Sequence, residues 1–254
     1  MNIKLALFIL LVILPLQFSY AGTTFIFNPE ARISKIKTVK SGLEKYLSLQ
    51  GNDTKVYIFA NSKDFQGSMP RLQPEIAIVA SYYFSSMKDE FKWKSILFGH
   101  KKGKKYFSKV LVTLKSITNI QQLKKKSLAT VALGAISSSY INTLLPTGLS
   151  VKNDDIRIVS VSKDIDAIMA LGFEQVQAAI VTKTSFNKLK KINPDAVKNL
   201  HILQKLNPIQ YPQVVVFPNT KNIDNLTNIF ANMSYKGSNR QVLRFFGITG
   251  FNVE

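Results

Sequence analysis

Three consecutive serines, Ser137, Ser138 and Ser139, form the most distinctive polar cluster of the sequence, and Tyr140 follows them directly. They lie between an expected strand at 128–133 and an expected helix. Backbone N–H groups and serine hydroxyls at the beginning of a helix bind anions such as phosphate. An ordinary serine N-cap with neighbours that face water fits the same pattern, so the residues alone leave both interpretations open.

A second polar and aromatic group, Ser81, Tyr82 and Tyr83, comes directly after the apolar segment 75–80. That segment is typical of a strand buried on both faces. Ligands of open α/β sheets bind beyond the carboxyl ends of the strands, and a tyrosine there offers a flat apolar face with a polar tip. The alternative is that the two tyrosines pack on a helix.

A third candidate group follows the expected strand 23–27 and consists of Asn28 and Arg32. The guanidinium group of an arginine can clamp a carboxylate or a phosphate. The alternative is a surface arginine in the first turn of the next helix. We take Asn28 and Arg32 as further candidates for ligand binding.

The residue composition argues against an enzyme or a metal site. The chain has no cysteine and two histidines, His100 and His201, and it lacks the common metalloprotease, serine-hydrolase and Walker motifs. We interpret Asp164, Asp166 and Glu174 as capping and surface residues of one helix. We therefore predict no catalytic residue, no metal and no cofactor. The alternative is a secreted hydrolase that uses Asp164 or Glu174.

The sequence is strongly basic, with 34 Lys and Arg residues against 15 Asp and Glu residues and a formal net charge of +19. Most of the lysine runs, such as 101–105 and 124–126, are expected to be solvated surface. Interleaved aromatic residues or a known nucleic-acid module are not found. We therefore expect no nucleic-acid partner and attribute the charge to peripheral contact with an anionic membrane surface.

The N-terminus has the pattern of a signal peptide. Lys4 precedes the apolar run 5–14, and small residues stand at Ser19 and Ala21. The apolar run is shorter than the roughly 20 residues of a membrane span. We expect cleavage after Ala21 and a soluble protein exported to the periplasm.

Hydrophobic periodicity behind these candidates predicts two α/β units. In the first, strands at 23–27, 55–60 and 75–80 alternate with a helix at 32–48, which is the pattern of a parallel sheet. A second unit fills about 117–205. We assign 22–110 and 214–254 to one lobe and 111–213 to the other, with crossing segments near 106–116 and 207–218.

Six segments, in this order, resemble the periplasmic solute-binding proteins of the phosphate, phosphite and phosphonate ABC transporters, which have a type 2 periplasmic binding fold. The segments are TFIFNP, EIAIVASYYF, SITNIQQLKKKSLATVALGAISSSY, DIDAIMALGFEQVQAAIV, NPIQYPQVVVFPN and RFFGITGF. The resemblance covers roughly 23–250. It implies two α/β lobes joined by two crossing strands, with a ligand held in the cleft between them.

In the phosphonate binders, a Ser-Thr-Ser-like loop at a helix N-terminus holds the anion, and 137–139 match that place. An aromatic residue after the third strand lines the cleft, which Tyr82 or Tyr83 matches. The chain departs from the family at Lys163, where the family often has a histidine, and at Gln177, where it often has an acid that binds an amino group of the ligand.

The resemblance implies a monomeric, non-enzymatic protein that closes its lobes on a small phosphate- or phosphonate-like anion for an ABC importer. The same fold could instead present its closed form to a sensor kinase or cyclase. A third alternative is a cleft that binds a lipidic ligand. The candidate ligand contacts are Asn28, Arg32, Ser81, Tyr82, Tyr83, Ser137, Ser138, Ser139 and Tyr140.

Overall fold

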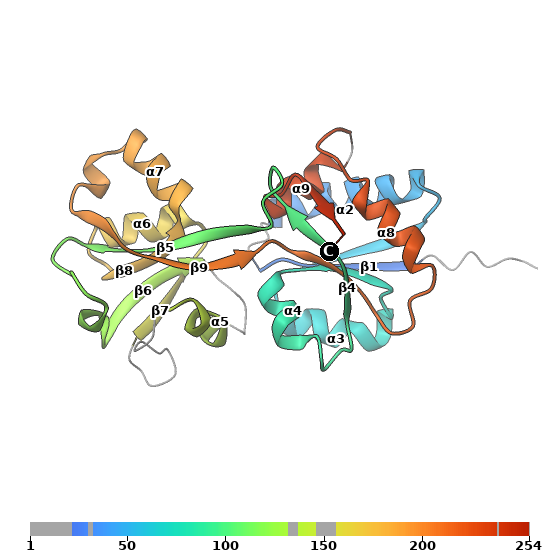
Figure 1. Cartoon of the computed structure of the whole chain (residues 1–254), viewed down its shortest axis with the longest axis horizontal. Helices are drawn as coiled ribbons and strands as arrows, with labels where there is room; N and C mark the ends of the chain where they lie inside the picture. Colours follow the sequence, from blue (N-terminus) through green and yellow to red (C-terminus); the bar gives the residue numbers. More distant parts are fainter. Residues whose placement is uncertain (1–21, 30–32, 132–136, 146–155, 238, 254) are drawn as a thin grey trace, which may run out of the picture.

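The structure is a computed structural model of the chain and describes residues 22–29, 33–131, 137–145, 156–237 and 239–253. Two α/β lobes lie end to end along the long axis and are connected by two long strands (Figure 1). In the described part, no helix is long and apolar enough to cross a membrane. The expected signal peptide and Arg32 lie outside the described residues.

The first sheet, which defines lobe 1, has the strand order β11-β4-β10-β3-β1-β2. Its neighbours β2, β1 and β3 are parallel, whereas β10 runs antiparallel to both β3 and β4, and β11 runs antiparallel to β4. The strands are β1 (Gly22–Phe27), β2 (Thr54–Phe59), β3 (Ile76–Val79), β4 (Lys94–His100), β10 (Gln213–Val216) and β11 (Gly250–Asn252).

Both faces of this sheet are covered by helices, and alternate residues of β1 contribute to different cores. Ile26 packs with one layer, whereas Phe25 and Phe27 pack with the other. Figure 1 shows α2, α8 and α9 on one side and α3 and α4 on the other. These helices are α2 (Ile33–Leu49), α3 (Ser62–Leu72), α4 (Ser81–Met87), α8 (Ile223–Ala231) and α9 (Arg240–Phe246).

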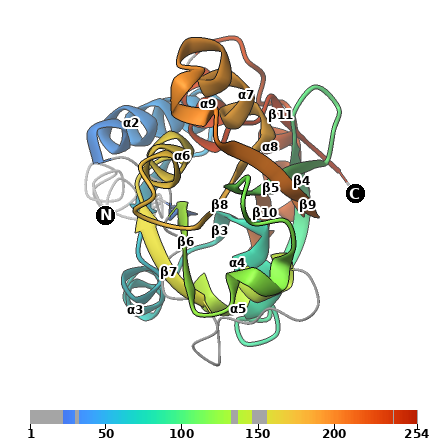
Figure 2. The same ribbon diagram turned by 90° about the vertical axis from the view of Figure 1, so that its left-hand side faces the viewer.

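The second sheet, which defines lobe 2, has the strand order β7-β6-β8-β5-β9, in which β6 is parallel to β7 and β8 and β5 is antiparallel to β8 and β9. Figure 2 shows α5 on one side of this sheet and α6 and α7 on the other. The elements are β5 (Tyr106–Leu114), β6 (Lys126–Val131), α5 (Ser137–Leu144), β7 (Ile156–Val161), α6 (Asp164–Gly172), β8 (Ala178–Thr182), α7 (Lys183–Ile192) and β9 (Leu200–Gln210), with short 3-10 helices η1 (Ile120–Leu123) and η3 (Asp195–Val197).

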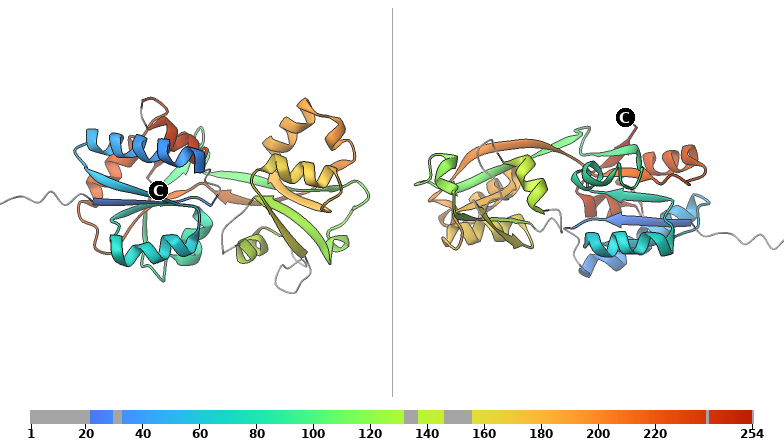
Figure 3. Two further views of the ribbon diagram at one scale, coloured as in Figure 1. Left: turned by 180° about the vertical axis from the view of Figure 1, so that it is seen from behind. Right: turned by 90° about the horizontal axis from the view of Figure 1, so that it is seen from below.

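The antiparallel pair β5 and β9 extends from lobe 2 towards lobe 1 and forms a ribbon between them (Figures 1 and 3). The backbone N–H of Tyr211 donates to the carbonyl oxygen of Lys105 at 3.1 Å, and that of Gly99 donates to the carbonyl oxygen of Pro212 at 2.7 Å. The chain therefore passes between the sheets at 101–105 and 211–212. The distance between the lobes is spanned by β5 and β9, and the crossing segments expected near 106–116 and 207–218 include β5 and the end of β9.

The two-lobed α/β architecture agrees with the fold expected from the sequence. Local differences concern short helices. Residues 81–84, which follow the expected strand 75–80, begin α4, and the segment between the expected strands 55–60 and 75–80 forms α3. A seven-residue helix such as α4 spans barely two turns, so its periodicity is too short to recognise in a sequence.

Candidate ligand-binding site

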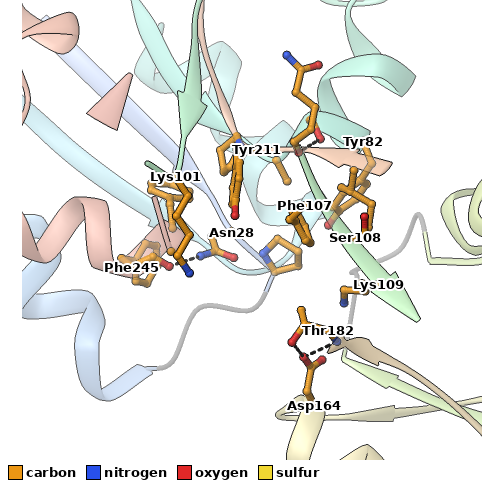
Figure 4. Close-up of a pocket in the computed structure, with 18 of the residues that line it drawn as sticks. Asn28, Tyr82, Lys101, Phe107, Ser108, Lys109, Asp164, Thr182, Tyr211 and Phe245 are labelled. Carbon is orange, nitrogen blue, oxygen red and sulfur yellow. Dashed lines mark hydrogen bonds between the residues drawn. The ribbon is translucent and has the colours of Figure 1, made fainter. Parts of the chain in front are cut away.

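A cavity of about 550 Å³ lies where the two lobes meet the β5–β9 ribbon (Figure 4). Lobe 1 contributes the carboxyl ends of β1 and β3, which meet at one edge of the sheet because the strands are parallel. Lobe 2 contributes the beginning of α6 and the junction of β8 with α7. The lining includes Asn28, Ser81, Tyr82, Lys101, Phe107, Lys109, Asp164, Thr182, Tyr211, Arg244 and Phe245.

Aromatic side chains from the ribbon form the middle of the cavity wall. The rings of Phe107 and Tyr211 lie 5.0 Å apart between centroids and are tilted by 36°. Tyr211 is buried, and this burial raises the pKa of its phenol. Tyr82 is half-buried and packs against the apolar clusters of both lobes. The ribbon and α4 thus present flat apolar surfaces to a ligand.

The lobe 2 side of the cavity is held in place by Asp164. Its Oδ2 atom accepts a hydrogen bond from the backbone N–H of Thr182 at 2.9 Å and another from the Thr182 hydroxyl at 2.7 Å. The Thr182 Oγ1 atom also accepts from the backbone N–H of Ser185 at 3.2 Å and caps α7. Asp164 therefore fastens the beginning of α6 to the end of β8, a link between two elements in place of the helix-capping or surface role expected for it.

Lys109 is the most buried charged residue of the lining, with 4% of its surface exposed. It belongs to β5 and pairs with Thr182 of β8 in the antiparallel ladder. Figure 4 shows it on the same side of the cavity as Thr182 and Asp164. Lys101, Asn28 and Phe245 lie across the cavity from this group in the same view.

Three residues proposed from the sequence lie in the cavity wall: Asn28, Ser81 and Tyr82. The side-chain amide of Asn28 donates to the carbonyl oxygen of Phe245 at 3.2 Å and connects the end of β1 to the end of α9. The Ser81 hydroxyl donates to the carbonyl oxygen of Gln210 at 2.6 Å and connects α4 to the ribbon. Both side chains thus help to fix the elements around the cavity.

Tyr83, also proposed from the sequence, is placed elsewhere. It is fully buried in the core of lobe 1, with its ring centroid 4.3 Å from that of Phe27 and 5.5 Å from that of Phe65. Its hydroxyl accepts a hydrogen bond from the side-chain amide of Gln66 at 3.1 Å. Burial raises the pKa of Tyr83 to about 12. Its position supports the packing alternative for this tyrosine, and Tyr82 is the residue that lines the cavity.

The serine cluster lies at the beginning of α5, as expected from the sequence, because α5 starts at Ser137. In the parallel ladder Thr130 of β6 pairs with Ile180 of β8, so β6 ends beside the part of β8 that leads into the cavity. The side chains of 137–140 lie outside the described residues, as does Arg32.

Gln177, one of the two positions noted above as departures from the family pattern, lies away from the cavity. Its side-chain carbonyl accepts from the backbone N–H and the hydroxyl of Ser127 at 3.2 and 3.0 Å. Ser127 is near the beginning of β6, at the opposite end of that strand from the cavity. Gln177 is therefore a structural link between β6 and the segment before β8.

Sequence reasoning missed Lys109, Thr182 and Tyr211. Lys109 and Tyr211 belong to the two segments expected to cross between the lobes, and that expectation was the available signal. Residues of a crossing segment necessarily border the cleft. Thr182 lies at the carboxyl end of an apolar strand, as Ser81 does. Because ligands of open α/β sheets bind beyond the carboxyl ends of the strands, the same rule could have selected Thr182 as a candidate.

Two α/β lobes, a connecting ribbon and a cavity between them define the class of two-lobed ligand-binding proteins. A family model described as "ABC transporter, phosphonate, periplasmic substrate-binding protein" matches residues 25–253. The chain therefore belongs to this family of periplasmic substrate-binding proteins, which the order of its motifs predicted. The members bind substrates for transport and are not enzymes, so the hydrolase alternative is set aside.

Solved structures share the fold. PhnD1 from Prochlorococcus marinus in complex with methylphosphonate is 15% identical, with a TM-score of 0.65, and the match covers 92% of this chain and 93% of that one. A binding protein component of an ABC phosphonate transporter from Pseudomonas aeruginosa is 14% identical, with a TM-score of 0.63 and coverage of 92% and 82%. XAC2383 from Xanthomonas citri bound to ATP is 10% identical, with a TM-score of 0.67 and coverage of 92% and 90%. A comparison with curated proteins finds no match.

Proposed function

We propose that this protein binds a small phosphonate- or phosphate-like oxyanion in the cavity between the lobes and delivers it to an ABC importer. The observation that carries the proposal is the charge of the cavity lining. Lys101, Lys109 and Arg244 line it, whereas Asp164 is the only carboxylate among the described lining residues. An excess of positive charge in a cleft with low-dielectric walls concentrates anions. The family match supports the same class of ligand.

The position of Lys109 supports an anion site next to α5. Leu111 and its ladder partner Ile180 pack in the same cluster as α5. Alternate residues of a strand share a face, so Lys109, two residues before Leu111, is on the α5 side of the sheet. The proposed anion is held between Lys109 and the amides and hydroxyls of 137–139, with Tyr140 next to it. From lobe 1, Asn28, Arg32, Ser81 and Tyr82 complete the proposed site.

Binding is proposed to stabilise a closed arrangement of the lobes. Only contacts that are stronger in the closed form can shift the population towards it. The cavity is lined from both lobes, so an anion held by lobe 2 gains contacts with lobe 1 when the ribbon bends. The closed form is the one that we propose the importer recognises.

A thermal-shift assay of residues 22–254 tests the proposal. The panel is phosphate, phosphite, methylphosphonate, sulfate and lipid-like anions. A ligand at 100 times its Kd adds about 2.7 kcal/mol, which for a chain of this size raises Tm by about 5–10 °C. Combined replacement of 137–139 by alanine removes hydrogen bonds to a charged group, each worth about 1.5–3 kcal/mol, and should abolish the shift. Stabilisation by lipidic anions alone would overturn the proposal in favour of a lipid binder.

Export, oligomeric state and partner are tested separately. We propose cleavage after Ala21, so the secreted protein should begin at Gly22, which N-terminal sequencing checks. Light scattering should give the mass of a monomer. Deletion of the gene should abolish uptake of the bound oxyanion if an importer is the partner. Unchanged uptake with an altered transcriptional response would instead assign the protein to a sensor kinase or cyclase.

A further inference from the structure

The cationic side chains of the cavity lie at two places, with aromatic residues between them. Lys109 belongs to the lobe 2 part of the lining, whereas Lys101 and Arg244 come from lobe 1. The neighbouring rings of Phe107 and Tyr211 lie between Lys101 and Lys109 in Figure 4. If the ligand were a single tetrahedral oxyanion held at Lys109, Lys101 and Arg244 would have no negatively charged group of the ligand to bind.

At the lobe 1 end of the cavity, backbone hydrogen bonds hold the segments that carry the cationic residues. Lys101 begins a tight turn closed by hydrogen bonds with Lys104 in both directions, at 3.0 and 3.1 Å. The backbone N–H of Thr249, next to β11, donates to the carbonyl oxygen of His100 at 2.7 Å and holds the base of this turn. Asn28 fixes the end of α9 through Phe245, next to Arg244. The two cations are therefore presented by segments tied to the sheet of lobe 1.

The lining also disfavours a ligand with a positive charge. Asp164, its only carboxylate among the described residues, already accepts two hydrogen bonds from Thr182 on the lobe 2 side. An ammonium group at the other end of a ligand would meet Lys101 and Arg244, and like charges repel.

We propose that the ligand carries two acidic groups, a phosphonyl or phosphoryl group bound near Lys109 and a second acid bound by Lys101 and Arg244. A short apolar spacer lies against Phe107 and Tyr211. The volume of about 550 Å³ is within the range of pockets that hold such extended ligands. This inference rests on the proposed function, because it takes the anion site at Lys109 as given.

Isothermal titration with three ligands of similar length tests the inference. They are 3-phosphonopropionate, propylphosphonate and 3-aminopropylphosphonate, which end in a carboxylate, a methyl group and an ammonium group. We expect 3-phosphonopropionate to bind at least tenfold more tightly than propylphosphonate, and the amine to bind most weakly. Phosphoglycolate, a phosphate ester with a carboxylate, shows whether the first group is preferred as a phosphonate or as a phosphate ester.

The double variant Lys101→Gln with Arg244→Gln should remove this preference, so that 3-phosphonopropionate and propylphosphonate bind with affinities within about twofold of each other. The matched control, Lys104→Gln with Arg240→Gln, makes the same change of charge on the same turn and helix, at residues outside the lining. It should keep the preference. Lys109→Gln should weaken all the phosphonates together.

The possible failures are distinguishable. Equal binding of 3-phosphonopropionate and propylphosphonate, tighter binding of the amine, or a preference that survives in the Lys101 and Arg244 double variant overturns the two-acid inference. The proposed function then stands, because phosphonates still bind. Absence of binding by all four ligands overturns this inference, and the proposed function falls with it if phosphate, phosphite and methylphosphonate also give no thermal shift.

Discussion

Tyr82 and Tyr83 are neighbours in the sequence, and the structure gives them opposite roles that mutation can separate. Tyr83 is fully buried among Phe27, Phe65 and Trp93, with ring centroids 4.3, 5.5 and 5.8 Å away. Replacement of a buried aromatic residue by alanine costs about 3–5 kcal/mol. For a chain of this size that corresponds to a fall in Tm of about 6–20 °C. We expect this loss for Tyr83→Ala, measured by thermal unfolding.

Tyr82→Ala is expected to behave in the opposite way. Tyr82 is half-buried, so its replacement should cost less stability than that of Tyr83. It lines the cavity, so the affinity for the bound oxyanion should fall. Titration calorimetry at a temperature where both variants are folded measures this affinity.

Tyr83→Phe is the conservative variant that remains informative if Tyr83→Ala does not fold. It keeps the ring and leaves the side-chain amide of Gln66 without its acceptor, at a cost of about 0.5–1.5 kcal/mol. Its ligand affinity should equal that of the native protein. A weakened affinity of Tyr83→Phe with unchanged stability would refute this reasoning, because it would mean that the hydroxyl reaches the ligand.

Three further predictions concern pH, a close backbone contact and the ribbon. The pKa of Tyr83 is raised from 10.0 to about 12, so the native state holds this proton more tightly than the unfolded state. The free energy of unfolding should therefore fall between pH 10 and pH 12, by at most about 1.4 kcal/mol per pH unit, and Tyr83→Phe should flatten this fall in urea titrations. A Cβ atom at Gly172 would lie 2.5 Å from a backbone oxygen of η3, whereas a Cβ atom at Gly67 would have no neighbour within 4 Å. Because of this close contact Gly172→Ala should lower Tm, whereas Gly67→Ala should leave Tm unchanged or raise it. Ser81→Ala should cost about 1 kcal/mol of stability through the lost bond to Gln210, and it should also weaken the affinity, because Ser81 belongs to the proposed site; an unchanged affinity would mean that its hydroxyl only joins α4 to the ribbon.

The architecture was predictable because its strands are encoded locally. The segment 75–80 is almost entirely apolar, which predicted burial on both faces, and all four residues of β3 are buried. The period of apolar residues at 32–48 likewise predicted α2. Such patterns depend only on the chemistry of residues close in the sequence, so they can be recognised without knowing which elements pack against them.

Individual site residues were less predictable, because a small change in helix phase redirects a side chain. The rule for strand ends selected 81–83, of which Ser81 and Tyr82 line the cavity and Tyr83 does not. Successive residues of a helix point about 100° apart, so the direction of Tyr82 and of Tyr83 depends on where α4 begins. Its start at Ser81 directs Tyr83 into the core and leaves Tyr82 at the cavity. No propensity in the sequence determines that start.

The shape of the ribbon could not be predicted at all, because it depends on shifts in the pairing register between two strands that are far apart in the sequence. Between the pairs Ser108–Pro208 and Val110–Lys205, β9 advances three residues while β5 advances two. A second such step separates Leu111 from Val112. A strand with extra residues bends, and β9 tolerates Pro208 because it is an edge strand. A bulge is defined only by the partner across the ladder, so neither strand reveals it alone. Since the first mismatch lies opposite Lys109, the bend and the buried cation are properties of the same contact between β5 and β9.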